Sequence, residues 1–414
     1  MDYDVAIVGA GASGLAAARR LKGSGLRAIV LEARGRIGGR GHTVTPSGEL
    51  HLDLGCGWLH SADRNPFTRI AHAQGLTIDR TPAAWGHDAP GFGMDAQARQ
   101  DFGRAMQALF DRIEAAARAP QDRPVSDLLD PDDRWTPLLN AFSAYYNGAE
   151  FHQVSVKDYA AYDDDSVNWR VLEGYGRAIA GLGADVEIAL QTPVVLIDHR
   201  GPRLRLHTPG GVLEASAVIV TVPTAHLAQQ RLRFLPELPD KAGAAEQLPL
   251  GLADKLFLLI DQPDALPKDA HVFGRPDRTE TGSYYLRPFG RPLIEVYVGG
   301  RHARALEAEG AAAFPAFAVE ELTGLLGSDF GRRLRPVAQS RWASDPHALG
   351  SYSHALPGGA GGRAVLAAPV DGRLFFAGEA TSAASFSTAH GAYLEGIRAA
   401  EEAMAALPHP AAAK

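Results

Sequence analysis

The first residues of the chain alternate between apolar runs and an alanine-rich segment. Residues 3–8 are mostly apolar, which predicts a strand buried on both faces of a parallel sheet. Residues 12–22 are rich in Ala and Leu and predict a helix, and residues 26–31 predict a second strand. The pattern therefore predicts a strand–helix–strand unit at this end of the chain.

Later parts of the chain show other periodicities. Residues 217–223 form an apolar run that ends at a proline and predict another strand, whereas residues 96–119 repeat with a helical period. The apolar face of that helix, which we expect to pack in a core, consists of Phe102, Met106, Leu109, Phe110 and Ile113. Residues 255–261, 284–287 and 293–298 alternate like antiparallel strands, and a helix is expected over 314–326.

Glycines occupy the turn between the first strand and the first helix, in the order Gly9-x-Gly11-x-x-Gly14. The first glycine permits the tight bend, the second lets a pyrophosphate approach the backbone, and the third lets the helix pack on the strand. The phosphates then lie at the helix N-terminus, where free N–H groups favour negative charge. Glu32, at the end of the second strand, is placed to accept a hydrogen bond from an adenosine ribose. The sequence therefore predicts a dinucleotide site.

The segments that follow narrow the choice of dinucleotide. Residues 32–40 read EARGRIGGR, and residues 53–60 read DLGCGWLH. These segments resemble those of the flavin-containing amine oxidase family, which includes monoamine and polyamine oxidases. The resemblance implies FAD as the cofactor, with Arg34 and Arg40 in contact with it and with Gly38 and Gly39 letting the backbone pass close to the flavin ring.

The resemblance extends along most of the chain, through residues 174–176, 188–198, 217–223, 251–256, 342–353 and 374–393, and it implies a strand at residues 188–198. It implies an α/β fold in which a Rossmann-type FAD-binding domain with a parallel sheet is interleaved with an α+β substrate-binding domain. The first domain would comprise residues 1–64, 184–250 and 343–414, and the second residues 65–183 and 251–342. The cofactor-binding residues expected from the glycine turn and the resemblance are Gly9, Gly11, Ala12, Ser13, Gly14, Glu32, Ala33, Arg34, Gly38, Gly39, Arg40, Gly55, Cys56, Gly57, Trp58, Val195, Trp342, Gly378, Glu379, Ala389 and His390.

Four residues are the catalytic candidates. Lys255 lies inside an apolar strand, where an unpaired lysine is costly to bury; in the family this lysine holds a water next to the flavin. By resemblance, Tyr352 and Tyr393 flank the substrate amine, and His60 lies at the pocket mouth. Each has a plainer interpretation: a lysine that reaches solvent, two core tyrosines and a structural histidine.

Two residues bear on how the cofactor is attached. Ser351 stands where monoamine oxidases have the cysteine that bonds the flavin, which implies that FAD is bound non-covalently. Cys56 is the single cysteine of the chain, so an intramolecular disulfide is excluded and a reducing compartment is favoured. We expect its thiol to be buried and inert.

The resemblance implies oxidation of an amine. A hydride passes from the carbon next to nitrogen to the flavin, the imine hydrolyses to an aldehyde and an amine or ammonia, and O2 is reduced to H2O2. A polyamine or another primary or secondary amine is the expected small-molecule substrate. Two alternatives stay open: an L-amino-acid oxidase, which needs an arginine such as Arg170 or Arg287 against the substrate carboxylate, and an amine dehydrogenase with an acceptor other than O2.

The composition of the chain mainly argues against other kinds of partner and site. The net charge is −7, and there is no basic block of the kind that a nucleic-acid partner would need. No apolar run approaches the roughly 20 residues of a membrane span, and no spacing of His, Cys and Asp suggests a metal site. We expect a cytoplasmic monomer or homodimer without a signal peptide or a C-terminal membrane anchor. The acidic cluster Asp163–Asp165 can attract a polycation, although a solvated loop is the simpler interpretation.

Overall fold

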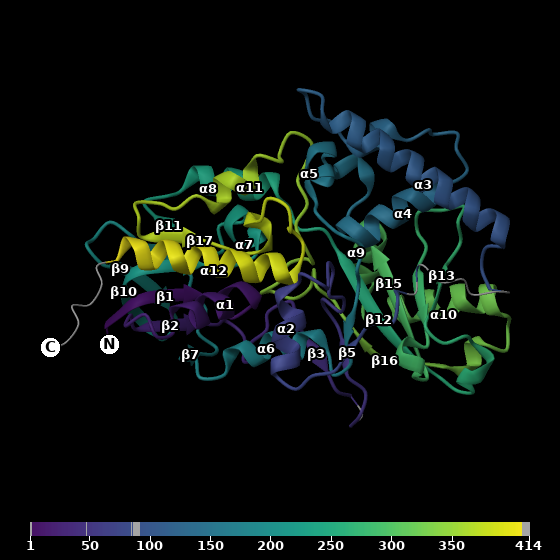
Figure 1. Ribbon diagram of the computed structural model, residues 1–414, viewed down its shortest axis with the longest axis horizontal. Helices are drawn as coiled ribbons and strands as arrows, with labels where there is room; N and C mark the ends of the chain where they lie inside the picture. Colours follow the sequence, from purple (N-terminus) through teal and green to yellow (C-terminus); the bar gives the residue numbers. More distant parts are fainter. Residues whose placement is uncertain (1, 47, 84, 86–91, 408–414) are drawn as a thin grey trace.

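The computed structural model describes residues 2–46, 48–83, 85 and 92–407, and it contains two large sheets (Figure 1). The eight-stranded sheet has the order β11-β8-β9-β10-β1-β2-β7, with β17 as a further partner of β10. Its strands are β1 (Asp2–Val8), β2 (Ala28–Leu31), β7 (Ile188–Ala189), β8 (Leu196–Asp198), β9 (Leu204–Thr208), β10 (Gly211–Val220), β11 (Arg233–Leu235) and β17 (Leu374–Phe376).

The centre of this sheet is parallel, because β17, β10, β1, β2 and β7 all run in the same direction. Strand β10 shares one edge between two partners: residues 211–215 pair with β9 in antiparallel fashion, and residues 218–220 pair with β17. The sequence therefore supplies the middle of one sheet from three distant parts of the chain.

Helices cover both faces of the parallel strands (Figure 1). Val5 and Ile7 pack against α1 (Ala12–Leu21) and α12 (Ala389–Ala406), whose residues share their hydrophobic cluster. Ala6 and Val8 face the opposite cluster, which includes residues of α7 (Thr224–Ala228), α8 (Pro239–Gln247) and α11 (Gly362–Ala367). The predicted strand buried on both faces is thus confirmed.

The second large sheet is antiparallel, in the order β13-β14-β15-β12-β16. Its strands are β12 (Ala253–Ile260), β13 (Ala270–Phe273), β14 (Ser283–Leu286), β15 (Leu293–Gly299) and β16 (Leu334–Gln339). Helices α9 (Gly300–Glu309) and α10 (Ala313–Leu326) pack on it through one apolar cluster. Helices α3 (Ala96–Ala117), α4 (Thr136–Asn147) and α5 (Val156–Ala161) form a further layer near the top of Figure 1.

Short elements complete the description. They are α2 (Pro66–Ala73), α6 (Tyr175–Ala180), the pair β3 (Thr43–Val44) and β4 (Leu52–Asp53), and the pair β5 (Ile78–Asp79) and β6 (Arg170–Val171). Single turns of 3₁₀ helix lie at Val125–Leu128, Phe151–Gln153, Gly181–Gly183, Pro263–Ala265, Pro288–Gly290, Gly331–Arg333 and Glu379–Thr381.

The predicted α/β fold class is confirmed, and one predicted strand is wrong. Residues 188–198 form two strands: β7 pairs in parallel with β2, and β8 pairs with β9 and β11. The chain leaves one edge of the sheet at Leu190 and rejoins the sheet, near its other edge, at Leu196. Pro193 lies between these two points and lacks the N–H that a ladder of hydrogen bonds needs. The sequence analysis expects no membrane anchor at the C-terminus, and residues 408–414 lie outside the described residues. Among those described, no helix has both the length and the apolar character to cross a membrane.

Candidate active site

A cavity of about 1550 Å³ runs between the two large sheets. At one end it is lined by residues that follow the parallel strands β1, β2 and β10, where dinucleotides bind in open α/β sheets. At the other end it is lined by the antiparallel sheet and by α3 and α4. The two halves of the cavity are continuous, so a cofactor in the first half can meet a substrate in the second.

The glycine turn forms a cradle at the first end. Gly9, Gly11, Ala12 and Ser13 line the cavity at the start of α1, whose first N–H groups have no acceptor within the helix. Gly14 lies behind the cradle, where an added Cβ would stand 1.9 Å from the Gly9 carbonyl oxygen. The tight packing at Gly14 and the open cavity at Gly11 match the roles that a pyrophosphate-binding turn requires.

Glu32 is held in place at the end of β2. Its Oε2 accepts a hydrogen bond from the Ala10 N–H at 2.7 Å, and its Oε1 accepts one from the Arg34 N–H at 2.8 Å. The side chain is buried, yet it lines the cavity. Since a carboxylate has about four lone-pair sites, Glu32 keeps acceptor capacity for a ribose hydroxyl.

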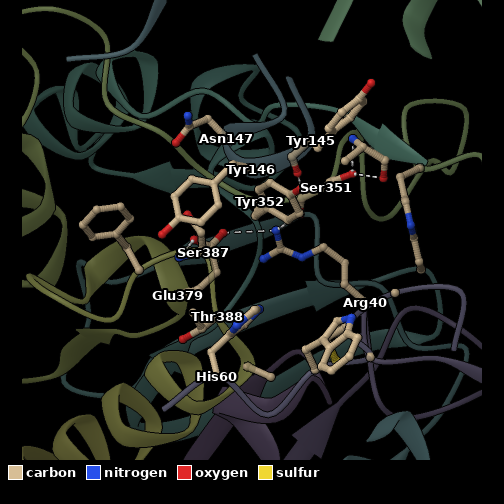
Figure 2. A pocket seen from close by; sticks show the side chains of 18 of the residues that line it. Arg40, His60, Tyr145, Tyr146, Asn147, Ser351, Tyr352, Glu379, Ser387 and Thr388 are labelled. Carbon is tan, nitrogen blue, oxygen red and sulfur yellow. Dashed lines mark hydrogen bonds and ion pairs between the residues drawn. The ribbon is translucent and has the colours of Figure 1, made fainter. Parts of the chain in front are cut away.

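Two arginines tie the cradle to the C-terminal part of the chain. Arg34 forms an ion pair with Asp345, in which Arg34 Nη2 donates to both carboxylate oxygens at 2.8 Å. Arg40 forms an ion pair with Glu379 at 3.1 Å and donates a hydrogen bond to the Ser351 carbonyl oxygen. Figure 2 shows the Arg40 guanidinium directed at Glu379. Both arginines line the cavity as predicted, but their charges are already paired within the protein.

Most of the predicted cofactor residues lie around the same space. Besides those already described, the predicted residues that line it are Ala33, Gly38, Gly39, Gly55, Cys56, Gly57, Trp58, Val195, Trp342, Gly378 and Ala389. Trp342 is fixed by a hydrogen bond from its indole N–H to the Leu54 carbonyl oxygen at 3.2 Å. The structure therefore gathers residues from both ends of the sequence and from β7–β8, as predicted.

Besides Gly14, which lies behind the cradle, two predicted residues do not line the cavity, and both of these lie on α12. Tyr393 packs edge-on against Phe67, with ring centroids 5.3 Å apart, in the core between α1, α12 and the sheet. His390 is buried, and burial lowers its pKa to about 4. The helix presents Ala389 and Ala392 to the cavity instead. Successive helical residues are rotated by about 100°, so positions 390 and 393 share the neighbouring face, and the roles of Tyr393 and His390 stay predictions that the lining of the cavity does not support.

Lys255 lines the cavity from β12. Its ammonium lies 3.0 Å from Glu295 Oε1 as an ion pair and donates a hydrogen bond to the Asp53 carbonyl oxygen at 3.1 Å. Gly57 leaves room for this ammonium, because a Cβ there would stand 2.9 Å from Lys255 Nζ. Burial lowers the pKa of Lys255, but Glu295, Tyr297 and Asp53 together raise it by more, so the pKa lies above its ordinary value. The lysine is buried and charged; it does not reach solvent.

Tyr352 and His60 are both at the cavity and both restrained. The Tyr352 hydroxyl donates a hydrogen bond to the Tyr145 carbonyl oxygen. His60 Nδ1 lies 2.6 Å from Asn168 Oδ1, and an amide oxygen accepts only from a protonated ring nitrogen. Burial lowers the pKa of His60. The neutral ring then offers Nε2 as an acceptor for a substrate N–H.

Aromatic rings form the part of the cavity beyond these residues, and we refer to this part as the aromatic chamber. Its walls include Phe110, Phe142, Tyr146, Tyr159, Tyr162 and Phe386. The rings are in mutual contact: the centroids of Phe142 and Tyr146 are 5.7 Å apart, and those of Tyr162 and Phe386 are 5.5 Å apart. Such walls exclude water and favour amines, whether neutral or cationic.

The sequence analysis expects a buried, inert Cys56, and the structure places it half-buried at the cavity wall. Burial raises the pKa of the Cys56 thiol to about 12, which makes it a poor nucleophile. The Ser351 hydroxyl donates to the Ala253 carbonyl oxygen and accepts from the Ala253 N–H, each at 2.8 Å. Within the described part of the chain, no group of three or more His, Cys, Asp and Glu side chains could hold a metal ion.

Glu295 is the important residue that the sequence analysis missed. It is fully buried in β15 and bridges Lys255 and Arg170. The signal was present in the sequence, because residues 293–298 read LIEVYV and place one acid in the middle of an apolar strand. A buried acid opposite a buried lysine predicts an ion pair once the strands are known to be neighbours.

Comparison with known proteins decides the family. The family model described as "Flavin containing amine oxidoreductase" matches residues 12–119 and 129–404. The chain belongs to this family. The amine oxidoreductase is therefore an FAD-dependent amine oxidase, and its FAD is bound non-covalently; the glycine cradle, Glu32 and the space at Gly11 fit that cofactor.

Individual relatives span most of this amine oxidoreductase. Polyamine oxidase 5 of Oryza sativa subsp. japonica is 29% identical over 435 residues, covering 96% of this chain and 87% of that protein. Lysine-specific histone demethylase 1 homolog 3 of the same organism is 30% identical over 437 residues, covering 96% of this chain and 53% of that protein. A solved structure of putrescine oxidase bound to putrescine has a TM-score of 0.79 at 22% identity, covering 98% of this chain and 99% of that one. This last likeness shows a shared fold.

Proposed function

We propose that this amine oxidase acts on a diamine, a polyamine or a related primary or secondary amine and passes the electrons to O2. When bound, the flavin supplies the redox chemistry, accepting a hydride from the carbon next to the amine nitrogen. Water then hydrolyses the imine to an aldehyde and an amine or ammonia. The protein's own contribution is to bind, orient and shield the amine.

The continuity of the cavity is the observation that carries this proposal. The cradle at Gly11 and the aromatic chamber belong to one space, and Lys255 and Tyr352 line it between them. Lys255 offers a fixed cation with a hydrogen-bond donor to spare, because an ammonium has three donors and its two protein contacts use at most two. We propose that this donor orients a water at the reaction centre.

His60 and Tyr352 are proposed to orient the amine. The unprotonated Nε2 of His60 accepts an amine N–H, which keeps the nitrogen lone pair available for the oxidation. The Tyr352 ring is held in one place by its hydrogen bond to the Tyr145 carbonyl, so it acts as a rigid wall. Ala392 lines the cavity and Tyr393 does not, so we propose that the site leaves room for a substituent on the amine.

Asp164 is proposed to bind a second, cationic nitrogen of the substrate. It lines the cavity and accepts hydrogen bonds from the Ser61 hydroxyl at 3.0 Å and the Ser166 N–H at 3.2 Å. The neighbouring Asp163 and Asp165 instead form ion pairs with Arg64. Asp164 therefore faces the chamber with its charge met by neutral groups, which suits an alkylammonium ligand.

The arginines considered for an L-amino-acid oxidase do not favour that alternative. Arg170 is buried and paired with Glu295 at 2.8 Å. Arg287 pairs with Asp264 at 3.0 Å and donates to the Leu266 carbonyl oxygen at 3.0 Å. Neither side chain lines the cavity, so neither is in position to bind a substrate carboxylate.

Anaerobic mixing of the holoenzyme with amines and amino acids, followed by flavin absorbance, tests the proposal. We expect putrescine or spermidine to bleach the flavin and amino acids to leave it oxidised. Bleaching by amino acids alone would move the protein to the L-amino-acid oxidases. Mixing the reduced enzyme with O2 then tests the acceptor: slow reoxidation by O2 but fast reoxidation by a quinone would make it a dehydrogenase.

A further inference from the structure

The register of two strands brings three polar side chains onto one face of the antiparallel sheet. Lys255 of β12 lies directly opposite Tyr297 of β15, and Glu295 lies opposite Phe257. Side chains alternate along a strand, so residues two positions apart share a face. Lys255 and Glu295 are thus diagonal neighbours, about 7–8 Å apart at the backbone, which is within reach of long side chains.

Glu295 makes two charge contacts, one with each oxygen. Its Oε1 lies 3.0 Å from Lys255 Nζ, and its Oε2 accepts a hydrogen bond from Arg170 at 2.8 Å. The exposed fractions are 0% for Glu295, 2% for Lys255 and 5% for Arg170. Two cations and one carboxylate are therefore removed from water together, and none of them can exchange its partner for solvent.

Arg170 is in turn fixed by aromatic rings. Its guanidinium carbon lies 4.8 Å from the Trp58 ring centroid, 5.1 Å from that of Tyr285 and 4.7 Å from that of Phe289. Cation–π contacts on three rings hold the guanidinium in place. Arg170 therefore presents Glu295 with a rigid donor, which leaves Oε1 directed toward Lys255.

We propose that Glu295 is a positioning residue for Lys255: anchored by Arg170, it holds the lysine ammonium at the cavity wall in its charged form. This inference rests on the proposed role of Lys255 in the amine oxidase reaction. Under it, Lys255 works throughout the catalytic cycle as a cation and hydrogen-bond donor, not as a base that takes the substrate proton. Of the groups we have described, His60 remains the proton acceptor at the amine.

Other charges around Lys255 agree with this assignment. The Lys255 ammonium lies 4.9 Å from the Tyr297 ring centroid, a favourable cation–π contact. Arg170 alone would disfavour a charged lysine nearby, because like charges repel. The Glu295 carboxylate between the two cations and the carboxylate of Asp53 both favour the charged lysine. The pKa of Glu295 itself is lowered from its ordinary value: burial raises it, and Arg170 and Lys255 together lower it more.

Direct titration of Lys255 in the resting holoenzyme tests the proposal without any substrate. The chain has six lysines, so biosynthetic labelling with [ε-¹³C]lysine gives a small set of NMR signals, and the Lys255→Met variant assigns the one that matters. We expect the Lys255 signal of the wild-type enzyme not to titrate between about pH 6 and about pH 10. A midpoint below about pH 9 in the wild type would overturn the proposal.

Variants of Glu295 separate positioning from a purely structural role. In Glu295→Gln the Lys255 midpoint should fall by two units or more, to about pH 8 or lower. Glu295→Asp should keep it high, and Glu309→Gln, an exposed change on α9, should not move it. An unchanged midpoint in Glu295→Gln would contradict the proposal. If Glu295→Gln does not fold, the wild-type titration still decides.

Kinetics provide a second measurement. In Glu295→Gln, flavin reduction by the best amine should acquire a new ionisation at the NMR midpoint, and the double variant Glu295→Gln/Lys255→Met should lack it. A new ionisation that persists in the double variant would assign it to another group. Failure of every amine to reduce the flavin would count against the proposed function and leave the NMR test unaffected.

Discussion

Three basic side chains that line the cavity are held by carboxylates from distant parts of the chain. Arg34 is paired with Asp345, Arg40 with Glu379, and Lys255 with Glu295. A buried charge is tolerated only when it is paired, and a paired charge is also a positioned one. The cations of the site are therefore parts of a rigid frame, and removing one costs stability unless another group still compensates its carboxylate partner.

Lys255 is the first of these paired cations for which we predict the effect of a substitution. We expect Lys255→Met to retain FAD, because none of the cradle residues is changed, and to slow turnover by about 10²-fold or more, in the range typical of a lost proton-handling or water-orienting group. Glu295 keeps Arg170 as a partner, so the fold should survive. Flavin content by absorbance and steady-state turnover are the measurements. Wild-type turnover in this variant would remove Lys255 from the mechanism.

Asp164 provides a matched pair of variants. We expect Asp164→Asn to raise KM for a diamine by about tenfold, the loss of roughly 1.4 kcal/mol of binding, and to change KM for a monoamine little. Asp163→Asn removes the same charge from the exposed partner of Arg64 and should leave both values near wild type. Equal effects of the two variants would indicate general attraction by the loop, and Asp164 would then not be a binding residue.

At the scale of residues, sequence motifs locate segments better than side chains. Lys255, Tyr352 and Glu379 reach the cavity as predicted. Tyr393 and His390 belong to the right segment but lie one helical position away from the cavity-lining Ala389 and Ala392. A motif fixes the order of residues, whereas the face that a helix residue presents depends on how the helix rolls against its neighbours, which for α12 is set by packing on α1.

At the scale of elements, the turn between β1 and α1 is the most sensitive point for the cofactor. A Cβ at Gly11 meets only Gly39 Cα, at 3.9 Å, so the protein itself tolerates a larger residue, whose side chain would occupy the cavity where we expect the pyrophosphate. We expect Gly11→Val to fold with the wild-type far-ultraviolet circular dichroism and to lack FAD. A yellow Gly11→Val protein with full flavin content would contradict the phosphate-binding role of this turn.

The contact between β12, α9 and the segment before residue 343 makes stability depend on pH. Asp254 accepts hydrogen bonds from the Ser340 hydroxyl at 2.7 Å and the Trp342 N–H at 3.2 Å. Burial and the nearby Glu307 carboxylate raise the pKa of Asp254 to about 8. The folded protein therefore holds a proton that the unfolded chain has released.

This contribution to stability is complete below the ordinary pKa of an aspartate, falls as the pH rises, and is lost once the pH passes about 8. We expect the free energy of unfolding in urea to decrease from about pH 5 to about pH 8. Asp254→Asn, which is neutral throughout, should make that decrease smaller. An identical pH dependence in the variant would show that Asp254 is ionised in the folded enzyme.

Elements with a strong local pattern could be predicted from the sequence, and those defined by distant partners could not. The helices at 96–117 and 313–326 and strands β12, β14 and β15 follow from periodicity. The split of residues 188–198 into β7 and β8 does not, because each piece is stabilised by a different neighbouring strand. The order of strands likewise depends on crossovers that no local pattern records.

At the scale of the whole molecule, the cavity lies between two sheets that meet around the cofactor site. A ligand that binds the folded enzyme stabilises it by about 4 kcal/mol at a free concentration 1000 times its Kd. We expect removal of FAD to lower Tm by several degrees and added FAD to restore it. Gly11→Val serves as the control, because its Tm should match the apoenzyme with or without FAD.

Strand β17 imposes an order on synthesis. Residues 218–220 of β10 pair with residues 374–376, α1 packs on α12, and Arg40 forms an ion pair with Glu379. Each of these contacts joins an earlier part of the chain to a part that is synthesised much later. A nascent chain that has emerged as far as residue 373 thus carries the glycine turn but an unfinished sheet. The ribosome must deliver nearly all of the described polypeptide before the pocket can close around FAD. Cofactor capture is accordingly a late event, and until then the exposed apolar edge of β10 is a surface for chaperones to protect.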